Sequence, residues 1–194
     1  MGVTERKERE KDEMRKLILD AAYEMFLKVG YEGTSIRLLA KKIEYSVGTI
    51  YLYYRDKDAL FFDIQTRCFD NLITLYKEIE GIENPLERLN QIGLTYMNHN
   101  MKNPQCFNIK FLLNAPLTEF KRKSRWEKYG NGMGFLKYTV NECIEQKLID
   151  YTDPLFASFQ IWAMAHGLTT LYVKGSYQGL DMTKEQAEEF ILRS

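Results

Sequence analysis

Proline, cysteine and histidine are scarce in this sequence, and each scarcity narrows the class of protein. Four prolines and 12 glycines among 194 residues exclude collagen-like and low-complexity chains. The 27 basic and 27 acidic residues cancel, so the chain is not coated with charge of one sign, although local patches remain open. Hydrophobic residues make up 45% of the chain, which predicts a packed core and excludes a wholly disordered protein.

The three cysteines, Cys68, Cys106 and Cys143, are too few and too far apart for a disulfide framework or a zinc ribbon. We expect each to be a small buried thiol. The only histidines are His99 and His166, and no HExxH, GxSxG or Walker pattern occurs. The sequence therefore predicts no enzyme, no catalytic residue, no metal and no cofactor. The glycines at 130, 132 and 134 do not complete a GxGxxG motif and follow no strand.

No targeting segment is expected, because the first residues carry mixed charge and form no apolar stretch. Residues 154–173 contain no Lys, Arg, Asp or Glu and are long enough to span a bilayer. The polar residues Ser158, Gln160 and His166 lie inside this segment, which favours a buried interface helix over a membrane span. We expect a cytoplasmic protein with no membrane contact.

Helix start and stop signals recur along the chain, whereas strand signals are weak. The start signals are a cap residue followed by proline, or a capping box: Asn84-Pro85, Asn103-Pro104, Asp153-Pro154, and Thr183 with Gln186. Gly30 and Gly81 stand where helices should end. The predicted fold class is all-α, with helices near residues 12–29, 35–43, 47–53, 57–80, 85–101, 105–113, 117–148, 154–177 and 183–193.

The two short predicted helices at 35–43 and 47–53 follow a longer one and form a helix-turn-helix pattern. Between Thr34 and Lys57, five basic and two acidic residues give a local charge of +3 in a neutral chain. The second short helix carries small and hydroxyl side chains, which can reach base edges and phosphates in a major groove. The alternative is an ordinary helical hairpin with a solvated charged face.

This region resembles the DNA-binding domain of the TetR/AcrR family of repressors. The resemblance rests on Thr34-Ser-Ile-Arg-Leu-Leu-Ala-Lys-Lys-Ile-Glu-Tyr-Ser-Val-Gly-Thr-Ile-Tyr-Leu-Tyr-Tyr-Arg-Asp-Lys-Asp-Ala-Leu60, on Ile18-Leu-Asp-Ala-Ala-Tyr-Glu-Met-Phe26, and on the Gly-x-x-x-Thr entry Gly30-Tyr-Glu-Gly-Thr34. It implies an N-terminal three-helix DNA-binding domain at residues 1–57 and a C-terminal helical domain for effector binding and dimerisation at residues 58–194. It also implies a homodimer that binds a palindromic double-stranded DNA operator and releases it when a small molecule binds.

We call the DNA-binding domain expected at residues 1–57 the head. The resemblance implies a role for individual residues of the head. Thr34, Tyr51 and Lys57 are the expected phosphate contacts, and the expected recognition surface comprises Arg37, Ser46, Val47, Thr49 and Tyr53, with Gly48 allowing close approach. Ala40, Ile50 and Tyr54 are expected in the core. The chain has Glu44-Tyr45 where the family usually has Gly-Val, so we expect Glu44 to need an unusual backbone angle.

Residues 156–171 are similar to the Trp…His-Gly (WHG) signature of one class of C-terminal domains in these regulators. Trp162 and His166 lie one helical turn apart, and Gly167 permits close helix approach. The similarity implies that the last two helices form the dimer interface. His166 is then either a hydrogen-bonded core or interface residue, or a ligand contact.

Aromatic residues on the middle helices predict a cavity for a small apolar or aromatic ligand, with plain core packing as the alternative for each residue. The candidate ligand residues are Phe69, Tyr76, Tyr96, Phe107, Phe111, Trp126, Phe135, Trp162 and His166. Two other functions stay open. One is a thiol-based redox-sensing regulator that uses the cysteines, and the other is a protein-interaction module without DNA binding.

Overall fold

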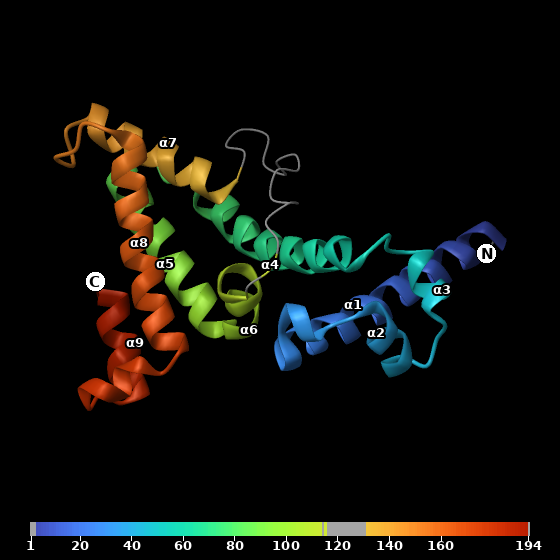
Figure 1. Ribbon diagram of the computed structural model, residues 1–194. Helices are drawn as coiled ribbons and strands as arrows, with labels where there is room; N and C mark the ends of the chain where they lie inside the picture. Colours follow the sequence, from blue (N-terminus) through green and yellow to red (C-terminus); the bar gives the residue numbers. More distant parts are fainter. Residues whose placement is uncertain (1–2, 114, 116–130, 194) are drawn as a thin grey trace. The chain divides into compact units, whose positions relative to one another are not determined.

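The computed structural model describes residues 3–113, 115 and 131–193, and all regular secondary structure in these residues is helical (Figure 1). In chain order the helices are α1 (Val3–Gly33), α2 (Ile36–Lys42), α3 (Val47–Tyr51), α4 (Lys57–Ile79), α5 (Pro85–Lys102), α6 (Pro104–Phe107), the π-helix η1 (Asn108–Leu112), α7 (Gly132–Glu145), α8 (Pro154–Val173), the 3-10 helix η2 (Ser176–Leu180) and α9 (Lys184–Arg193). The predicted all-α fold is confirmed.

Side-chain caps fix most of the predicted helix starts. Asn84 accepts hydrogen bonds from two backbone N–H groups in the first turn of α5, and Asp153 does the same for α8. Thr183 and Gln186 exchange the two hydrogen bonds of a capping box at α9. Asn103 differs from the prediction, because its side-chain amide donates to a carbonyl in the last turn of α5. It therefore closes α5 instead of capping α6.

Several predicted helices have different bounds in the structure. The helix expected at 12–29 begins at Val3, and it is broken at Gly30, whose φ is 73°. The helix expected at 105–113 is divided into α6 and η1. The helix expected at 154–177 ends at Val173, because Gly175 adopts a left-handed conformation with φ of 72°. The helix expected at 117–148 is described from Gly132, where Asn131 caps it, and its predicted first part lies outside the described residues. Among the described helices, α8 included, none combines the length and hydropathy that a membrane crossing requires.

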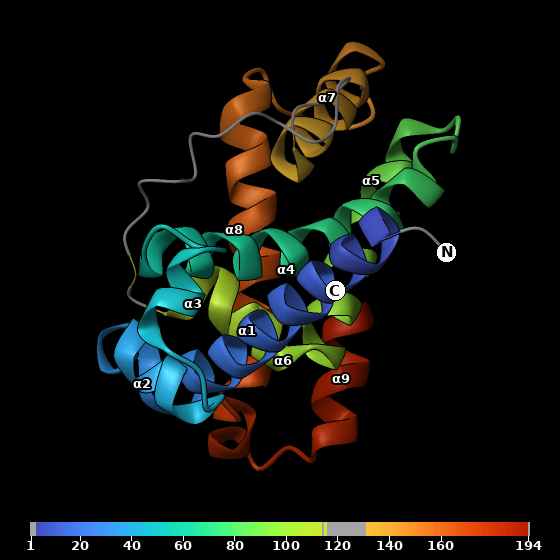
Figure 2. The same ribbon diagram turned by 90° about the vertical axis from the view of Figure 1, so that its right-hand side faces the viewer.

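The chain forms two compact units. The first holds residues up to Cys68 and the segment from Gln105, and the second holds Phe69–Pro104 and the described residues from Asn131 on. In the first unit α2 contacts both α1 and α3 (Figure 2). Its core includes edge-to-face ring pairs of Phe61 with Phe26 and with Tyr31, at centroid distances of 4.9 and 5.2 Å. In the second unit α5, α7 and α8 contact one another, and α9 packs on α8.

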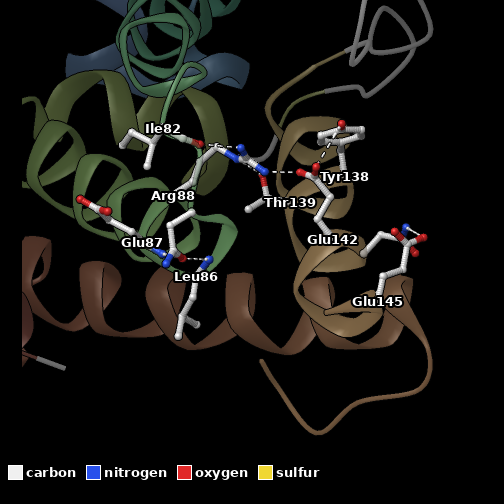
Figure 3. Close-up of polar contacts among 10 residues, drawn as sticks. Ile82, Leu86, Glu87, Arg88, Tyr138, Thr139, Glu142 and Glu145 are labelled. Atoms are coloured by element: carbon white, nitrogen blue, oxygen red, sulfur yellow. Dashed lines mark hydrogen bonds and ion pairs between the residues drawn. The ribbon is translucent and has the colours of Figure 1, made fainter. Parts of the chain in front are cut away.

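A buried arginine joins α5 to α7 in the second unit (Figure 3). Arg88 is 7% exposed, and its guanidinium pairs with Glu142 of α7. It also donates to the Thr139 hydroxyl at 3.3 Å and to the Ile82 carbonyl at 2.6 Å. A buried charge is costly unless it is paired and hydrogen-bonded, and Arg88 has three partners, two on α7 and one in the loop before α5. The cluster thus fixes the packing of α5 on α7.

The cysteines differ from the prediction. Cys68 of α4 and Cys106 of α6 form a disulfide within the first unit, with a Cα–Cα distance of 5.4 Å. The expectation of three buried thiols is wrong for these two, since the fold returns α6 to α4 across a sequence separation of 38. Cys143 is a buried free thiol, as predicted, and burial raises the pKa of its sulfur.

Candidate functional site

The turn between α2 and α3 is built by backbone hydrogen bonds around one left-handed residue. Glu44 has φ of 61°, which confirms the unusual backbone angle expected there. The Glu44 N–H donates to the Lys41 carbonyl, and the Tyr45 N–H donates to the Ala40 carbonyl at 3.0 Å. This pair of bonds is the Schellman pattern that ends many helices, usually with glycine at the left-handed position. The turn ends at Ser46, whose hydroxyl accepts from the Thr49 N–H and caps α3.

Core contacts fix which face of α3 is exposed. Ile50 is fully buried, and Tyr54 and Ala40 are buried beside it, which confirms the three expected core positions. The Tyr54 hydroxyl donates to Asp63 of α4 at 2.9 Å. Because Ile50 points inward, Gly48 and Tyr51 on the other side of α3 face solvent, and Tyr51 is 52% exposed.

The other predicted recognition residues divide between this face and the core. Ser46 is exposed and Thr49 is half-buried, and their hydroxyls are 2.9 Å apart. Val47 and Tyr53 are half-buried because they pack against the core that contains Ile50. Arg37 of α2 is exposed, and its side chain makes no ion pair or hydrogen bond within the described part of the chain. The structure thus exposes Arg37, Ser46, Gly48 and Tyr51, whereas Val47 and Tyr53 turn toward the core.

The basic residues of the head fall into two groups. Lys42 pairs with Glu24 at 2.8 Å, and Arg55 pairs with Asp56 at 3.0 Å. Lys41, like Arg37, is exposed and has no ion pair among residues 3–113, 115 and 131–193. Exposed pairs of this kind contribute little to stability, so even the paired cations remain available to a phosphate.

Two predicted phosphate contacts are engaged within the head. Thr34 is 2% exposed, and its hydroxyl donates to the Gly30 carbonyl at 2.8 Å. Lys57, the first residue of α4, donates to the Tyr31 carbonyl at 2.9 Å, and its ammonium lies 3.9 Å from the centroid of the Tyr31 ring. Thr34 therefore stabilises the backbone before α2 from a buried position, whereas Lys57 is half-buried at the start of α4.

Sequence reasoning gave no contact role to several exposed apolar residues of the head, among them Leu38 of α2 and two residues next to α3. Leu52, directly after α3, is 81% exposed, and Tyr45 in the turn is 45% exposed. The available signal was the helical spacing, because Leu52 lies four residues after Gly48 and two after buried Ile50, on the solvent side.

Three candidate ligand residues meet between α5 and α8 in the second unit. The Tyr96 hydroxyl lies 2.8 Å from His166 Nδ1, and the Trp162 side chain also hydrogen-bonds to Tyr96. The Trp162 and His166 rings are 5.3 Å apart, and burial lowers the pKa of His166. The hydrogen-bonded histidine expected from the sequence is present, and it lies beside two other predicted residues.

The remaining candidates form further ring pairs, and buried Tyr76 also interacts electrostatically with Tyr96. Tyr76 and Phe135 pack together in the second unit at 5.9 Å, and Phe107 and Phe111 pack together in the first unit at 5.4 Å. Phe69 is half-buried on α4, and Trp126 lies outside the described residues. The nine predicted residues are therefore distributed over several places, of which the Tyr96 cluster is the most polar.

The last two helices expose apolar side chains. Those of α8 and α9 are Leu155, Phe156, Phe159, Met164, Leu171 and Phe190. An open hollow of about 590 Å³ lies at α9 and is lined by Asp181, Met182, Gln186, Glu189, Phe190 and Arg193. No predicted ligand residue lines it, so the hollow gives no support to the ligand site expected from the sequence.

The N-terminal part of the chain is similar in sequence to bacterial transcriptional regulators. Residues 18–64 match the family described as bacterial regulatory proteins, tetR family. The HTH-type transcriptional regulator HbdR of Aromatoleum sp. (strain CIB) is 36% identical over 83 residues, which are 40% of this chain and 34% of that protein. The HTH-type transcriptional repressor KstR of Rhodococcus jostii (strain RHA1) is 38% identical over 80 residues, 41% of this chain and 37% of that protein. The chain thus spans about a third of the length of these curated relatives.

Likeness to solved structures extends over nearly the whole chain. The crystal structure of AibR in complex with isovaleryl coenzyme A and operator DNA aligns with a TM-score of 0.65 and 22% identity, covering 92% of this chain and 95% of that one. At this identity the comparison shows a shared fold. The Trp…His-Gly resemblance of residues 156–171 stays a prediction.

Proposed function

We propose that this chain is a repressor of the TetR family that binds a palindromic DNA operator as a homodimer and releases it when a small molecule binds, because residues 18–64 match that family and the fold is shared with AibR. The observation that carries the proposal is the face of α3. It is exposed, lacks acidic side chains, and adjoins the unpaired cations Arg37 and Lys41. A short helix of this kind suits the major groove, and neighbouring cations suit the phosphates.

Individual residues have distinct roles in this proposal. Tyr51 and Lys57 donate to phosphate oxygens, and Arg37 reaches a phosphate or a base from α2. Gly48 lets the backbone of α3 approach the bases, and Thr49 offers its hydroxyl. Thr34 acts indirectly, since its buried hydroxyl holds the carbonyl of Gly30 at the entry to α2. We retain residues 1–57 as the DNA-binding domain and residues 58–194 as the effector and dimerisation domain.

The first experiment is selection of bound duplexes from a random DNA pool by the purified protein. Enrichment of a two-fold symmetric site, with half-sites one helical turn apart, is the expected result. Tyr51→Ala should weaken binding to that site strongly and leave the oligomeric state unchanged. Tyr151→Ala, at an exposed tyrosine outside the head, is the matched control. A folded protein that enriches no duplex would favour the interaction module, and binding by Tyr51→Ala at wild-type affinity would remove Tyr51 from the interface.

The exposed apolar side chains of α8 and α9 support a homodimer through the last two helices. Helix α8 carries no charged residue over its 20 residues, and Phe159 is more than half exposed in the single chain. Such a surface is typical of an interface between subunits. Sedimentation should show a dimer, and Phe159→Glu should shift the equilibrium toward monomers. A wild-type monomer at micromolar concentration would contradict the proposed assembly.

The Tyr96, Trp162 and His166 cluster is the proposed effector contact, with an apolar or aromatic ligand. AibR, which shares the fold, is crystallised with both a coenzyme A thioester and operator DNA, and this supports control by a small molecule. Helix α4 begins at the head and continues into the second unit, so a ligand that prefers one arrangement of α4 can change DNA affinity. His166→Ala should alter release by an identified effector without altering DNA affinity in its absence.

The disulfide favours a second candidate function, a thiol-based redox-sensing regulator. Cys68 lies within α4, the helix that begins at the head, and half-buried Cys106 makes the bond reachable from solvent. A hydroperoxide oxidises the two thiols to the disulfide, releasing an alcohol and water, and a dithiol reduces the bond while becoming a disulfide itself. Oxidation links α4 covalently to α6, and reduction removes this link.

Operator affinity in dithiol and in peroxide tests this candidate. A coupling of typical size would change affinity by about 5- to 150-fold. Cys68→Ser and Cys106→Ser should each remove the response, whereas Cys143→Ser, at the buried free thiol, should keep it. Equal affinity of the wild-type protein under both conditions would leave ligand control as the single proposal.

A further inference from the structure

The surface of α3 differs from a typical base-reading surface in its side chains. From Val47 to Leu52 there is no Arg, Lys, Asn, Gln, Asp or Glu. Arginine or lysine to guanine, asparagine or glutamine to adenine, and carboxylates to cytosine make the hydrogen-bonded contacts that identify bases in the major groove. Helix α3 lacks all of these groups. Its means of reading a base are hydroxyl groups and apolar contact.

The centre of the exposed face is formed by Gly48 and Leu52. They lie four residues apart, and the Leu52 N–H donates to the Gly48 carbonyl at 3.3 Å, which keeps both residues on one side of α3. A helical side chain leans toward the N-terminus, so the Leu52 side chain lies over the turn that begins at Gly48. At 81% exposed, Leu52 is also the most exposed of the large hydrophobic side chains in the described residues.

The fold does not require the absence of a side chain at Gly48. A Cβ atom there would have the Ser46 hydroxyl as its nearest neighbour, at 3.6 Å, which is ordinary contact. Glycine inside a helix costs about 1 kcal/mol relative to alanine. Gly48 therefore leaves an opening on the surface of α3, and Leu52 and Thr49 border it.

Charge around this opening fits a nucleic-acid duplex. Arg37 and Lys41 on α2 are exposed without ion pairs in the described part of the chain, and Tyr51 adds a hydroxyl beside Leu52. Exposed Glu44 is the acidic residue of this surface. An apolar centre whose rim carries two cations and one carboxylate matches the major groove at a thymine, whose C5-methyl group is an apolar feature among the base edges there.

We propose that Leu52 reads a thymine methyl group, so that each operator half-site carries an A·T pair facing Gly48 and Leu52. The inference rests on the proposed DNA-binding function and adds the class of base pair and the residue that selects it. Apolar contact supplies the selectivity, because the other three bases offer no methyl at this edge.

Replacement of thymine by deoxyuridine tests the inference, because it removes the methyl group and keeps base pairing. The selected operator is prepared with deoxyuridine at each thymine in turn, in both half-sites. One position should weaken binding of the wild-type protein about fourfold per half-site, or about 15-fold for the symmetric pair, the value expected for one buried methyl group. Leu52→Ala should weaken binding to the thymine operator by at least as much and be insensitive to deoxyuridine at that position.

Leu17→Ala, at an exposed leucine of α1 in the same unit, is the matched control and should keep the wild-type response. Leu52 makes few contacts with the rest of the chain, so both variants should fold, and circular dichroism checks this. Tight binding to a symmetric operator with no methyl-sensitive position, or equal deoxyuridine effects in wild type and Leu52→Ala, would overturn the inference and leave the proposed function intact. Absence of any selected operator would overturn both.

Discussion

Replacement of Glu44 by glycine separates two effects of the turn between α2 and α3. Glu44 holds φ of 61° at the end of α2, where glycine is the usual residue. A left-handed conformation costs an L-residue about 1–2 kcal/mol, and the greater freedom of glycine in the unfolded chain offsets about 0.5–1 kcal/mol of the gain. We expect Glu44→Gly to raise the free energy of unfolding by about 0.5–1 kcal/mol. The thermal midpoint should rise by about 2 °C for a chain of this length.

The same substitution removes a negative charge from the proposed DNA surface. At a separation of about 8 Å from a phosphate in water, the repulsion corresponds to about a twofold change in affinity per protomer. Affinity for the selected operator should therefore rise about fivefold for a dimer at low salt, and the gain should shrink near 0.15 M salt, where the Debye length is about 8 Å. Glu44→Gln should give the affinity gain without the stability gain, because it removes the charge and keeps the left-handed residue.

A second turn in the chain provides the matched control. Lys147 has φ of 57°, its N–H donates to the Ile144 carbonyl, and the Leu148 N–H donates to the Cys143 carbonyl at 2.9 Å. This is the hydrogen-bond pattern of the Glu44 turn at the end of α7, outside the head. Lys147→Gly should stabilise the protein by a similar amount and leave operator affinity unchanged. Stabilisation by Lys147→Gly but not by Glu44→Gly, measured by thermal denaturation, would refute the reasoning for the head.

Three further predictions concern buried polar groups. Arg88→Met should lower the free energy of unfolding by about 3 kcal/mol in denaturant titrations, because it leaves Glu142 without its buried partner, and the double variant with Glu142→Leu should recover part of the loss. Burial lowers the pKa of Lys110 to about 8, so above pH 8 the unfolded chain binds more protons than the folded protein does. The free energy of unfolding should therefore rise by about 1.5 kcal/mol from pH 8 to 9.5. Lys110→Met should abolish this rise. Burial also lowers the pKa of His166, so the neutral imidazole contributes to the free energy of unfolding above pH 6.5, and this contribution is lost as pH falls through the folded-state pKa. Between pH 7.5 and pH 5, the free energy of unfolding should therefore fall less in His166→Gln than in the wild-type protein.

Local signals in the sequence were sufficient for the helical fold and for the head. Asn84, Asp153 and Thr183 cap the helices that they were expected to cap, because a cap is a contact within four residues. The left-handed angle of Glu44 was predictable from the family resemblance, since the family usually has glycine at this position. The core positions Ala40, Ile50 and Tyr54 followed from helical periodicity and the family resemblance.

Tertiary structure alone decided which distant residues meet. Cys68 and Cys106 are 38 residues apart, and no spacing rule marks them as a pair; the packing of α6 on α4 does. The aromatic residues of the middle helices share a chemistry that suits either core or ligand site, and only packing separates the Tyr96–His166 contact from the other ring pairs. Periodicity fixes a residue's face on its own helix, but the neighbour of that face depends on how the helices pack. The sequence by itself therefore determined the helices and the identity of the head, and the tertiary structure decided the disulfide, the buried Arg88 cluster and the Tyr96–His166 contact.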